Sequence, residues 1–517
     1  MKTKHIYLVW FIALLPTMLL RDFTLMNELR YLSIADEALR NGNIFTFTNQ
    51  GVIYTDKPPL YFWLMMLGKT LLGGHRMWFL SLLSFIPALV TLITMTKWIR
   101  KENGVNERFP LLMLMTGGFF LVFTVYIRMD MLMVMVMFIT LSLYTFYKIY
   151  KQEHRKRDLY LFPLYVFLAL FSKGPVGILV PVVSTLLFLL YKRQLNTIQR
   201  YWGWKSLLII LTGCVIWFTG VYIEGGKEYL YDLVVHQTVD RGINAFHHKE
   251  PFYFYAMTIW YALAPWSLLV IGLIIAGWLK KKIDTDIERF FAIIVVSTFV
   301  MLSVFSSKQD YYLLPIIPFA IYLSMLLLNK FDVQNPWIKL SIAIPAVIFI
   351  SAPVVIFYLS RMEEAAFLGM PSIFVVAAIV SISGLIVIYR LYRKNNVYRS
   401  LGVMSIGILS MIFVLGCSMP RLNPYIGVAD LCKHAKTLAE ENRITNYCVY
   451  GIHRAENMDV FLGEDVKMVE KEDIVGDSLT NAIVMLPVKK IKKDEELHSA
   501  IKNKTYLEIG NHAIVIF

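Results

Sequence analysis

The sequence predicts a polytopic α-helical membrane protein with about 13 transmembrane helices and a small α/β domain at the C-terminal end. Three observations support this fold class. Hydrophobic residues make up 57% of the 517 residues and charged residues 17%, whereas soluble chains average about 25% charged residues. Long stretches contain no acidic or basic residue, and the basic residues gather between alternate stretches. A soluble multidomain enzyme, a disordered chain and a disulfide-stapled scaffold are therefore excluded.

The membrane spans are predicted from stretches without Asp, Glu, Lys or Arg, since a helix needs about 20 mostly apolar residues to cross the hydrocarbon core. These stretches cover approximately residues 6–21, 77–97, 109–127, 131–148, 159–172, 175–191, 206–223, 254–279, 290–306, 311–328, 339–359, 370–389 and 400–419. The first resembles a signal peptide, but no small-residue cleavage site follows, so we expect a retained helix. The fifth is short, and Ser172-Lys173-Gly174-Pro175 after it could belong to a broken helix.

The formal net charge is +14, and between the predicted spans the basic residues gather in alternate segments on one side. They fall within the segments 97–108, 148–157, 192–205, 280–282 and 390–399. All these segments are on the side of the N-terminus, which the positive-inside rule makes cytoplasmic, so no nucleic-acid partner is needed to explain the charge. The opposite side carries loops near 22–76 and 224–253 and the tail 420–517. No repeat relates the halves of the chain, which weighs against internally duplicated transporters.

The tail has the composition of a small soluble domain. Residues 428–442 have helical spacing, and short β-type runs follow at Tyr447–Gly451, Ala482–Leu486, Tyr506–Ile509 and Ala513–Phe517. We therefore expect two domains, a transmembrane domain over 1–419 and an external α/β domain over 420–517. A packing module without chemistry is the favoured interpretation of the tail. Cys432 and Cys448 could form a disulfide there, or remain two buried thiols.

The first external loop contains the strongest cluster of polar motifs. Asn27-Glu28-Leu29-Arg30-Tyr31 comes directly after the first span, and Tyr54-Thr55-Asp56-Lys57-Pro58 precedes an aromatic stretch. Helix-like apolar spacing between these motifs predicts interfacial helices, with acids and bases near the membrane plane.

Further charges border apolar runs on the same external side. They are Arg128, Asp130, Lys173, Lys308 and Asp310. A charge at the centre of a membrane helix costs about 2.5–3.5 kcal/mol, so these side chains should face a polar cavity or one another. Each one alone could equally be a helix-end anchor or half of a structural ion pair.

The second external loop carries His236, Asp240, Arg241, His247 and His248. Imidazole together with a carboxylate such as Asp56 could bind a divalent metal ion, but no compact metal-binding motif demands one. Surface histidines are the favoured interpretation of His247 and His248.

These residue types suit group transfer from a lipid phosphate. An acid can accept the proton of an acceptor hydroxyl, while Lys and Arg hold a phosphate leaving group at headgroup level. The predicted phosphate-binding residues are Arg30, Lys57, Arg241 and Lys308. No nucleotide fold, and hence no nucleotide cofactor, is needed.

The motifs together resemble the GT-C glycosyltransferases that use polyprenyl-phosphate sugars, in the superfamily of aminoarabinose (lipid A) transferases and protein O-mannosyltransferases. The resemblance covers the whole chain. It rests on the order and spacing of the first-loop acid followed by x-Arg-Tyr, the motif Tyr54 to Pro58, Asp130, Ser172-Lys173-Gly174, Arg241, Pro251, and Ser307-Lys308 with Tyr312.

The resemblance implies roles for individual residues. Lys57 and Arg241 would hold the donor phosphate, and Asp130 would be a second functional acid. The other implied substrate-binding residues are Arg30, Tyr31, Tyr54, Lys173, Lys308 and Tyr312. Asp56 and His236 match the positions that bind a metal ion in such enzymes.

One position departs from the family's pattern. The family's acid pair is usually Asp-Glu, whereas this chain has Asn27-Glu28, and an amide cannot act as a general base. The catalytic candidates are therefore Glu28 and Asp130, with Asn27 at the substituted position. Glu28 is the favoured base, although a subfamily with another acceptor, or an impaired enzyme, would also explain the amide.

The expected function is transfer of a sugar from undecaprenyl phosphate to a periplasmic-face acceptor such as lipid A, by an inverting single displacement that is implied by the family. The expected location is a bacterial inner membrane, with a cytoplasmic N-terminus and a periplasmic tail. The alternatives are a transporter or flippase of a lipid-linked sugar, transfer to protein or another surface glycan, and a scaffold without activity.

Overall fold

The structure is a computed structural model that describes residues 2–101, 106–126, 132–235, 249–476 and 478–517. The chain folds into two compact units, each made of several segments. Unit 1 comprises Met1–Leu15, Thr55–Tyr61 and Ser81–Val414, and unit 2 comprises Pro16–Tyr54, Phe62–Leu80 and Leu415–Phe517. The predicted domain boundary near residue 419 stays a prediction.

Nine helices in the described part of the chain are long and apolar enough to cross a membrane. They are α1 (Thr3–Leu20), α4 (Met77–Arg100), α7 (Leu132–Tyr150), α11 (Trp204–Tyr231), α15 (Asp286–Val304), the 3₁₀-helix η5 (Asp310–Ile316) with α16 (Ile317–Leu328), α17 (Pro336–Leu359), α18 (Pro371–Tyr392) and α19 (Val397–Cys417). The pair α5 (Arg108–Met115) and α6 (Gly118–Leu121), bent by 69°, would make a tenth. The multi-pass membrane architecture is confirmed.

Every predicted stretch contains helix, but the count of about 13 spans is not established because several stretches are short or broken. α8 (Asp158–Lys173) and α9 (Val176–Tyr191) are separate helices of 16 residues each. The stretch 254–279 is divided into α13 (Phe254–Ala262) and α14 (Ser267–Leu279). A π-helix, η2 (Val122–Tyr126), follows α6. Irregular backbone at membrane depth is tolerated where protein or a cavity covers it.

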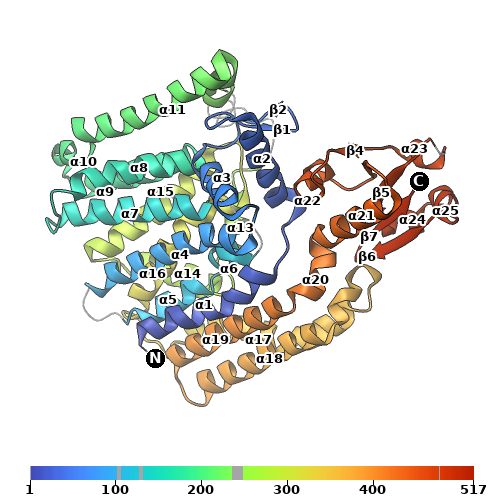
Figure 1. Ribbon diagram of the computed structural model, residues 1–517. Helices are drawn as coiled ribbons and strands as arrows, with labels where there is room; N and C mark the ends of the chain where they lie inside the picture. Colours follow the sequence, from blue (N-terminus) through green and yellow to red (C-terminus); the bar gives the residue numbers. More distant parts are fainter. Residues whose placement is uncertain (1, 102–105, 127–131, 236–248, 477) are drawn as a thin grey trace. The chain divides into compact units, whose positions relative to one another are not determined.

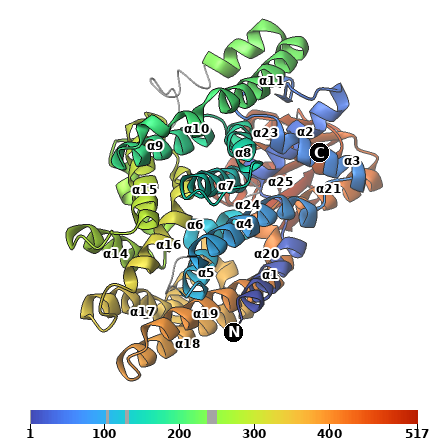
Figure 2. The same cartoon turned by 90° about the vertical axis from the view of Figure 1, so that its left-hand side faces the viewer.

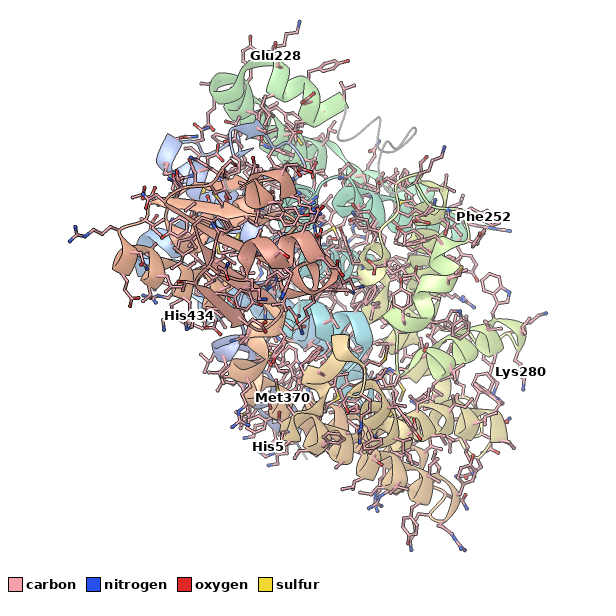
Figure 3. All side chains as sticks on the ribbon, turned by 90° about the vertical axis from the view of Figure 1, so that its right-hand side faces the viewer. His5, Glu228, Phe252, Lys280, Met370 and His434 are labelled. Carbon is pink, nitrogen blue, oxygen red and sulfur yellow. The ribbon has the colours of Figure 1, made fainter. Side chains whose placement is uncertain are left out.

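Unit 1 is a bundle in which neighbouring helices in the chain also pack together. α7, α8, α9 and α15 lie side by side, and α17 and α18 form a helical hairpin (Figures 1 and 2). Aromatic rings fill the interior: Trp98 packs edge-on against Phe291 with ring centroids 5.0 Å apart, and Phe188 contacts Phe290 at 4.7 Å. Other aromatic side chains lie at the surface of the unit. Phe252, just before α13, points outward and has 77% of its surface exposed (Figure 3).

Ion pairs tie the ends of these helices together. The ammonium of Lys148 lies 2.6 Å from Asp158, and that of Lys192 lies 2.8 Å from Asp286. α15 begins with a capping box, in which Thr285 and Glu288 satisfy each other's backbone N–H groups. Short connections follow α9: the 3₁₀-helix η3 (Leu195–Thr197) and α10 (Gln199–Trp202). Another, η6 (Glu363–Gly369), joins α17 to α18.

The C-terminal part of unit 2 is a five-stranded sheet with helices (Figure 1). Its elements are α20 (Met419–Ile426), α21 (Ala429–Asn442), β3 (Asn446–Val449), η7 (Ala455–Met458), α22 (Asp459–Leu462), β4 (Val466–Met468), α23 (Lys471–Val475), β5 (Ala482–Pro487), α24 (Val488–Lys493), α25 (Glu495–Ile501), β6 (Tyr506–Ile509) and β7 (His512–Ile516). The strand order is β4-β3-β5-β7-β6, parallel over the first three and antiparallel over the rest.

The core of this sheet explains which strands the sequence predicted. Val484, Leu486 and Val515 are buried together, and strands β3, β5, β6 and β7 lie at the four predicted β-type runs. β4 was not predicted, because two of its three residues are exposed and no apolar alternation marks it. Cys432 and Cys448 are buried free thiols, so the alternative of a disulfide between them is not borne out.

The first-loop part of unit 2 contains the π-helix η1 (Leu25–Leu29), α2 (Arg30–Asn41), the hairpin strands β1 (Thr48–Asn49) and β2 (Val52–Ile53), and most of α3 (Leu60–Leu72). Glu37 organises the hairpin: its carboxylate accepts hydrogen bonds from the N–H groups of Gln50 at 2.8 Å and Gly51 at 3.0 Å, and from the Thr48 hydroxyl. The predicted helices of this loop are thus α2 and α3.

Candidate functional site

A cavity of about 480 Å³ lies within unit 1 and contains several of the predicted site residues. Its polar lining comes from residues 55–57, from Lys173 and from Ser307 and Tyr312. The remaining wall is almost wholly apolar and is formed by Pro58, Leu170, Gly174, Pro175, Val176, Ile178, Leu179, Trp217, Phe218, Leu233, Val234, Leu302 and Phe305. A cavity of this kind suits a ligand with a small charged end and a long apolar part.

Two ammonium groups supply the positive charge of the cavity. Lys57 lies between α3 and the preceding β-hairpin, and its Nζ donates to the carbonyl of Asp56 at 3.2 Å. Lys173 comes from the last turn of α8, only 9% of its surface is exposed, and its Nζ lies 5.3 Å from the ring centre of Tyr311. Apolar walls lower the local dielectric, so an anion between such groups is held more strongly than in water.

The break between α8 and α9 places Lys173 on the cavity. Gly174 ends α8 with φ +99°, a left-handed backbone that residues with a side chain rarely adopt, and its N–H donates to Leu170 at 2.8 Å. A Cβ on Gly177 would meet the backbone of Ala169 at 2.2 Å, so only glycine permits this close turn between the helices. The motif Ser172-Lys173-Gly174-Pro175 therefore forms a tight turn between α8 and α9, which pack against each other, and the alternative of one broken helix is not borne out.

Asp56 is the one carboxylate among the described residues that line the cavity. Within the described ranges no three His, Cys, Asp or Glu side chains are grouped so as to hold a metal ion. His236, its predicted partner, lies outside the described residues. A metal ion at Asp56 and His236 stays a prediction.

Lys308 does not line the cavity, although its neighbour Ser307 does. Its Nζ donates to the carbonyls of Phe305 at 2.6 Å and Glu250 at 2.9 Å, and only 4% of its surface is exposed. Burial lowers the pKa of this ammonium. In the structure Lys308 thus joins the segment before α13 to the end of α15, and its predicted contact with substrate stays a prediction.

Glu28 lies in unit 2 with only 1% of its surface exposed. Both of its carboxylate oxygens accept from the Arg21 guanidinium at 2.7 Å, and it also accepts from the N–H and hydroxyl of Thr24 at 2.7 and 3.0 Å. Sequence analysis did not single out Arg21, although the pair Arg21-Asp22 ends the first apolar run and could have pointed to it. The carboxylate of Glu28 thus links Arg21 and Thr24 to η1.

Arg30, Tyr31 and Tyr54 lie in one chain of ring contacts in unit 2. The guanidinium of Arg30 lies 4.7 Å from the ring centre of Tyr54, a cation–π contact. Tyr31 and Tyr54 each pack edge-on against Phe62, with ring centroids 6.0 and 6.1 Å apart. Contact of these three residues with substrate stays a prediction, and Phe62 was noted only as part of an aromatic stretch.

The remaining predicted residues divide into two groups. Asn27 lies in η1 beside Glu28. Asp130 and Arg241, like Arg128, Asp240, His247 and His248, lie outside the described residues.

Sequence analysis missed four residues that line the cavity. Thr55 and Ser307 were not singled out individually, and Trp217 and Phe218 were missed because an aromatic pair inside an apolar run carries no local signal of a pocket.

Part of the chain matches a protein-family model. The family described as dolichyl-phosphate-mannose-protein mannosyltransferase matches residues 56–218, which include Lys57 and Lys173.

Among curated proteins the chain is similar to an uncharacterized protein of Aquifex aeolicus, with 25% identity over 321 residues, 59% of this chain and 61% of that protein. It is also similar to the undecaprenyl phosphate-alpha-4-amino-4-deoxy-L-arabinose arabinosyl transferase of Shewanella sediminis, with 24% identity over 67% of this chain and 64% of that enzyme. The chain thus spans about three fifths of the length of these relatives.

Among solved structures, ArnT from Cupriavidus metallidurans bound to undecaprenyl phosphate has a TM-score of 0.74 at 16% identity, covering 100% of this chain and 98% of that one. The same protein in the apo state has a TM-score of 0.73 at 17% identity, covering 99% and 96%. At this level of identity the likeness concerns the fold.

Proposed function

The chain has the GT-C fold of the aminoarabinose transferase type, as its sequence motifs predicted, and from this premise we propose that it transfers a sugar from a polyprenyl phosphate to an acceptor at the outer face of a bacterial inner membrane. Undecaprenyl phosphate is the proposed carrier, and lipid A is the proposed acceptor. The observation that carries the proposal is the cavity of unit 1, where Lys57 and Lys173 stand at the polar part of an otherwise apolar wall.

The two lysines share one task in this proposal, and the apolar wall has another. Their ammonium groups neutralise the donor phosphate and stabilise the charge that it gains when the sugar leaves. The apolar wall, including Trp217 and Phe218 from α11, accommodates the first part of the polyprenyl chain. By resemblance, Arg241 adds a further positive charge, and Tyr312 lies at the same cavity.

The proposed reaction is a single displacement with inversion at the anomeric carbon. An acceptor hydroxyl oxygen forms the new bond to this carbon, the bond to the phosphate oxygen breaks, and the polyprenyl phosphate leaves with the electron pair. The hydroxyl proton needs a base. Asn27 cannot serve, and four donors already occupy the carboxylate of Glu28.

We therefore assign the proton to Asp130 on the strength of the family resemblance, and a positioning role to Glu28. This revises the preference for Glu28 that the sequence alone suggested. A divalent ion at Asp56 and His236 would act as a Lewis acid if bound, and its requirement is tested by transfer activity after chelation and metal readdition.

Mass spectrometry tests the function directly. Lipid A and the polyprenyl-phosphate sugar pool are compared in cells without the chain and in cells restored with wild type, Lys57→Met or the control Lys227→Met. Lys227 is an exposed lysine of α11. We expect wild type and the control, but not Lys57→Met, to restore a lipid A species that is one sugar heavier.

The other outcomes separate the alternatives. Accumulation of a lipid-phosphate sugar with unchanged lipid A would move the acceptor to a protein or another glycan. A purified chain that moves the donor across vesicles without releasing polyprenyl phosphate would be a flippase, and the proposed transfer would be wrong.

A further inference from the structure

The C-terminal segment of unit 2 makes several contacts with the first-loop residues 20–33, which include Asn27 and Glu28. The guanidinium of Arg454 donates through Nη1 to the carbonyl of Met26 at 2.7 Å, immediately before Asn27. The hydroxyl of Ser33 donates to Asp459 at 3.1 Å. The rings of Phe23 and Phe461 lie 6.0 Å apart. Residues 454–461, here called the bracing segment, thus reach both ends of η1.

A second set of contacts fixes the entry to the same turn. Asn423 of α20 accepts from the N–H of Asp22 at 3.1 Å and donates to the carbonyl of Leu20 at 2.9 Å. The carboxylate of Asp22 in turn accepts from the N–H of Ala429, the first residue of α21, at 2.8 Å. Residues 20–22 are therefore held by α20 and α21, and residues 23–33 by the bracing segment.

The backbone at Arg454 is itself unusual. Its φ of +59° places it in the left-handed region, which a residue with a side chain adopts only where neighbours enforce it. Asn457, fully buried, donates to the carbonyl of Arg454 at 3.1 Å and so supports this corner. This backbone conformation points the guanidinium of Arg454 at the Met26 carbonyl.

We propose that the C-terminal domain sets the position of the first-loop acid turn, with Arg454 as the principal positioning residue; the consequence for transfer rests on the proposed function. This gives the domain a task in the reaction without any chemistry of its own. A hydrogen bond from a charged donor stabilises the turn that accepts it, so its loss should increase the local opening of the turn by about tenfold.

Hydrogen exchange of the full-length chain in detergent tests the positioning without reference to activity. The variants are Arg454→Met, which keeps the apolar stem, Arg454→Lys, which keeps a donor, and the control Arg443→Met. Arg443 is exposed and also has a left-handed backbone, at the end of α21. We expect about tenfold faster exchange of amides 24–31 in Arg454→Met only, with exchange in β5 unchanged.

Steady-state kinetics of the same variants test the link to transfer. We expect kcat of Arg454→Met to fall about tenfold with the KM for the lipid-phosphate donor unchanged, and Arg454→Lys to recover most of the rate.

Two exchange results would overturn the proposal: unchanged exchange at 24–31 in Arg454→Met, or an equal rise in β5, which would make Arg454 a general stabiliser of the sheet. Faster exchange at 24–31 with an unaltered kcat would overturn its link to transfer. If wild type has no transferase activity, the proposed function fails, and the exchange data still decide whether the domain positions the turn.

Discussion

Asp22 is a buried residue of the first loop whose carboxyl makes the stability of the chain depend on pH. Burial raises the pKa of its carboxyl to about 6, even though the N–H groups of Ala429 and Phe23 donate to it. The folded chain therefore binds this proton more tightly than the unfolded chain, in which the pKa is near its ordinary value of 3.8. Stability from this group is complete below about pH 4 and is lost as the pH rises through about 6.

Replacing Asp22 by Asn should remove this pH dependence. The amide oxygen can still accept from Ala429, and it carries no charge at any pH. Between pH 4 and pH 7 we expect the wild type to lose about 2–3 kcal/mol of stability relative to Asp22→Asn. Denaturant unfolding of both purified chains across this range measures the difference, and parallel pH profiles would contradict it.

Variants of the buried ion pair Arg21–Glu28 separate the effect of Glu28 on stability from its effect on transfer. Arg21→Met leaves a buried carboxylate without its partner, which should destabilise the chain by about 3–5 kcal/mol. The double variant Arg21→Met/Glu28→Met removes both charges and should recover most of the stability. Unfolding curves of the single and double variants measure both effects.

Transfer activity of the same double variant distinguishes the two candidate bases. With Asp130 as base, the double variant should keep about a tenth of the wild-type rate or more, since the loss of a positioning contact costs roughly this factor. A stable but wholly inactive double variant would return the base to Glu28.

Sequence reasoning found the residue types of the candidate site but not their individual partners. Lys57 and Asp56 were predicted from their motif in the first external loop. Lys173 was predicted because a charge beside an apolar run is costly unless a polar site receives it, and the structure places all three residues on the cavity. The same reasoning chose Lys308, whose cost is instead met by two backbone carbonyls. The residue type alone does not tell a lysine that lines a cavity from a lysine that donates to backbone carbonyls.

At the scale of the element, the break between α8 and α9 has the clearest consequence. Gly174→Ala forces a side chain onto a left-handed backbone and should cost about 1–2 kcal/mol. Because Lys173 is the preceding residue, the KM for the donor should rise as well. Gly402→Ala is the matched control, since a Cβ at this position in α19 meets nothing within 4 Å. A donor KM equal to that of the control would contradict the prediction.

Asp36 joins two elements of the first loop and behaves oppositely to Asp22. Burial alone would raise its pKa, but the hydrogen bonds and charges of His75 and Lys69, each 2.6 Å away, hold the pKa below its usual range. Its contribution to stability is therefore present above its unfolded pKa and is lost as the pH falls. Acid below this range should therefore weaken the contacts that join α2 to α3 and to the segment before α4.

Helices were predicted well because apolar length is a local property of the sequence. Their breaks were harder to predict. Sequence analysis used the signal of Gly174-Pro175, but it overlooked Pro265, a helix-breaking residue at which the stretch 254–279 is divided. Near it, the N–H of Gly118 donates to the carbonyl of Ala264 at 2.7 Å, a contact between α6 and the break that no local pattern encodes.

At the scale of the whole molecule, the predicted sidedness follows from where the basic residues lie. Single cysteines at Lys394 and Thr480, in a chain whose own four cysteines are replaced, test this orientation. Both positions are exposed, one between α18 and α19 and the other before β5. A membrane-impermeant maleimide should label Thr480→Cys in intact spheroplasts and Lys394→Cys only after lysis. The opposite pattern would invert the topology.

The division into two interleaved units was beyond the reach of sequence reasoning. Composition separates residues 420–517 from the rest because their apolar content falls, but it cannot show that residues 16–54 and 62–80 form a compact unit with them. That association depends on side chains such as Asn423 and Arg454, whose partners are about four hundred positions away.

This separation along the chain has a consequence for biosynthesis. The hydrogen bond between Asp22 and Ala429 joins residues 407 positions apart. A ribosome adds roughly 5–20 residues per second, so on the order of 20–80 s separate the emergence of the two partners. The pair Arg21–Glu28, only 7 positions apart, can form at once. During this delay the first loop lacks its contacts with α20, α21 and the bracing segment, so we expect quality-control proteases to cleave it more readily than in the finished protein.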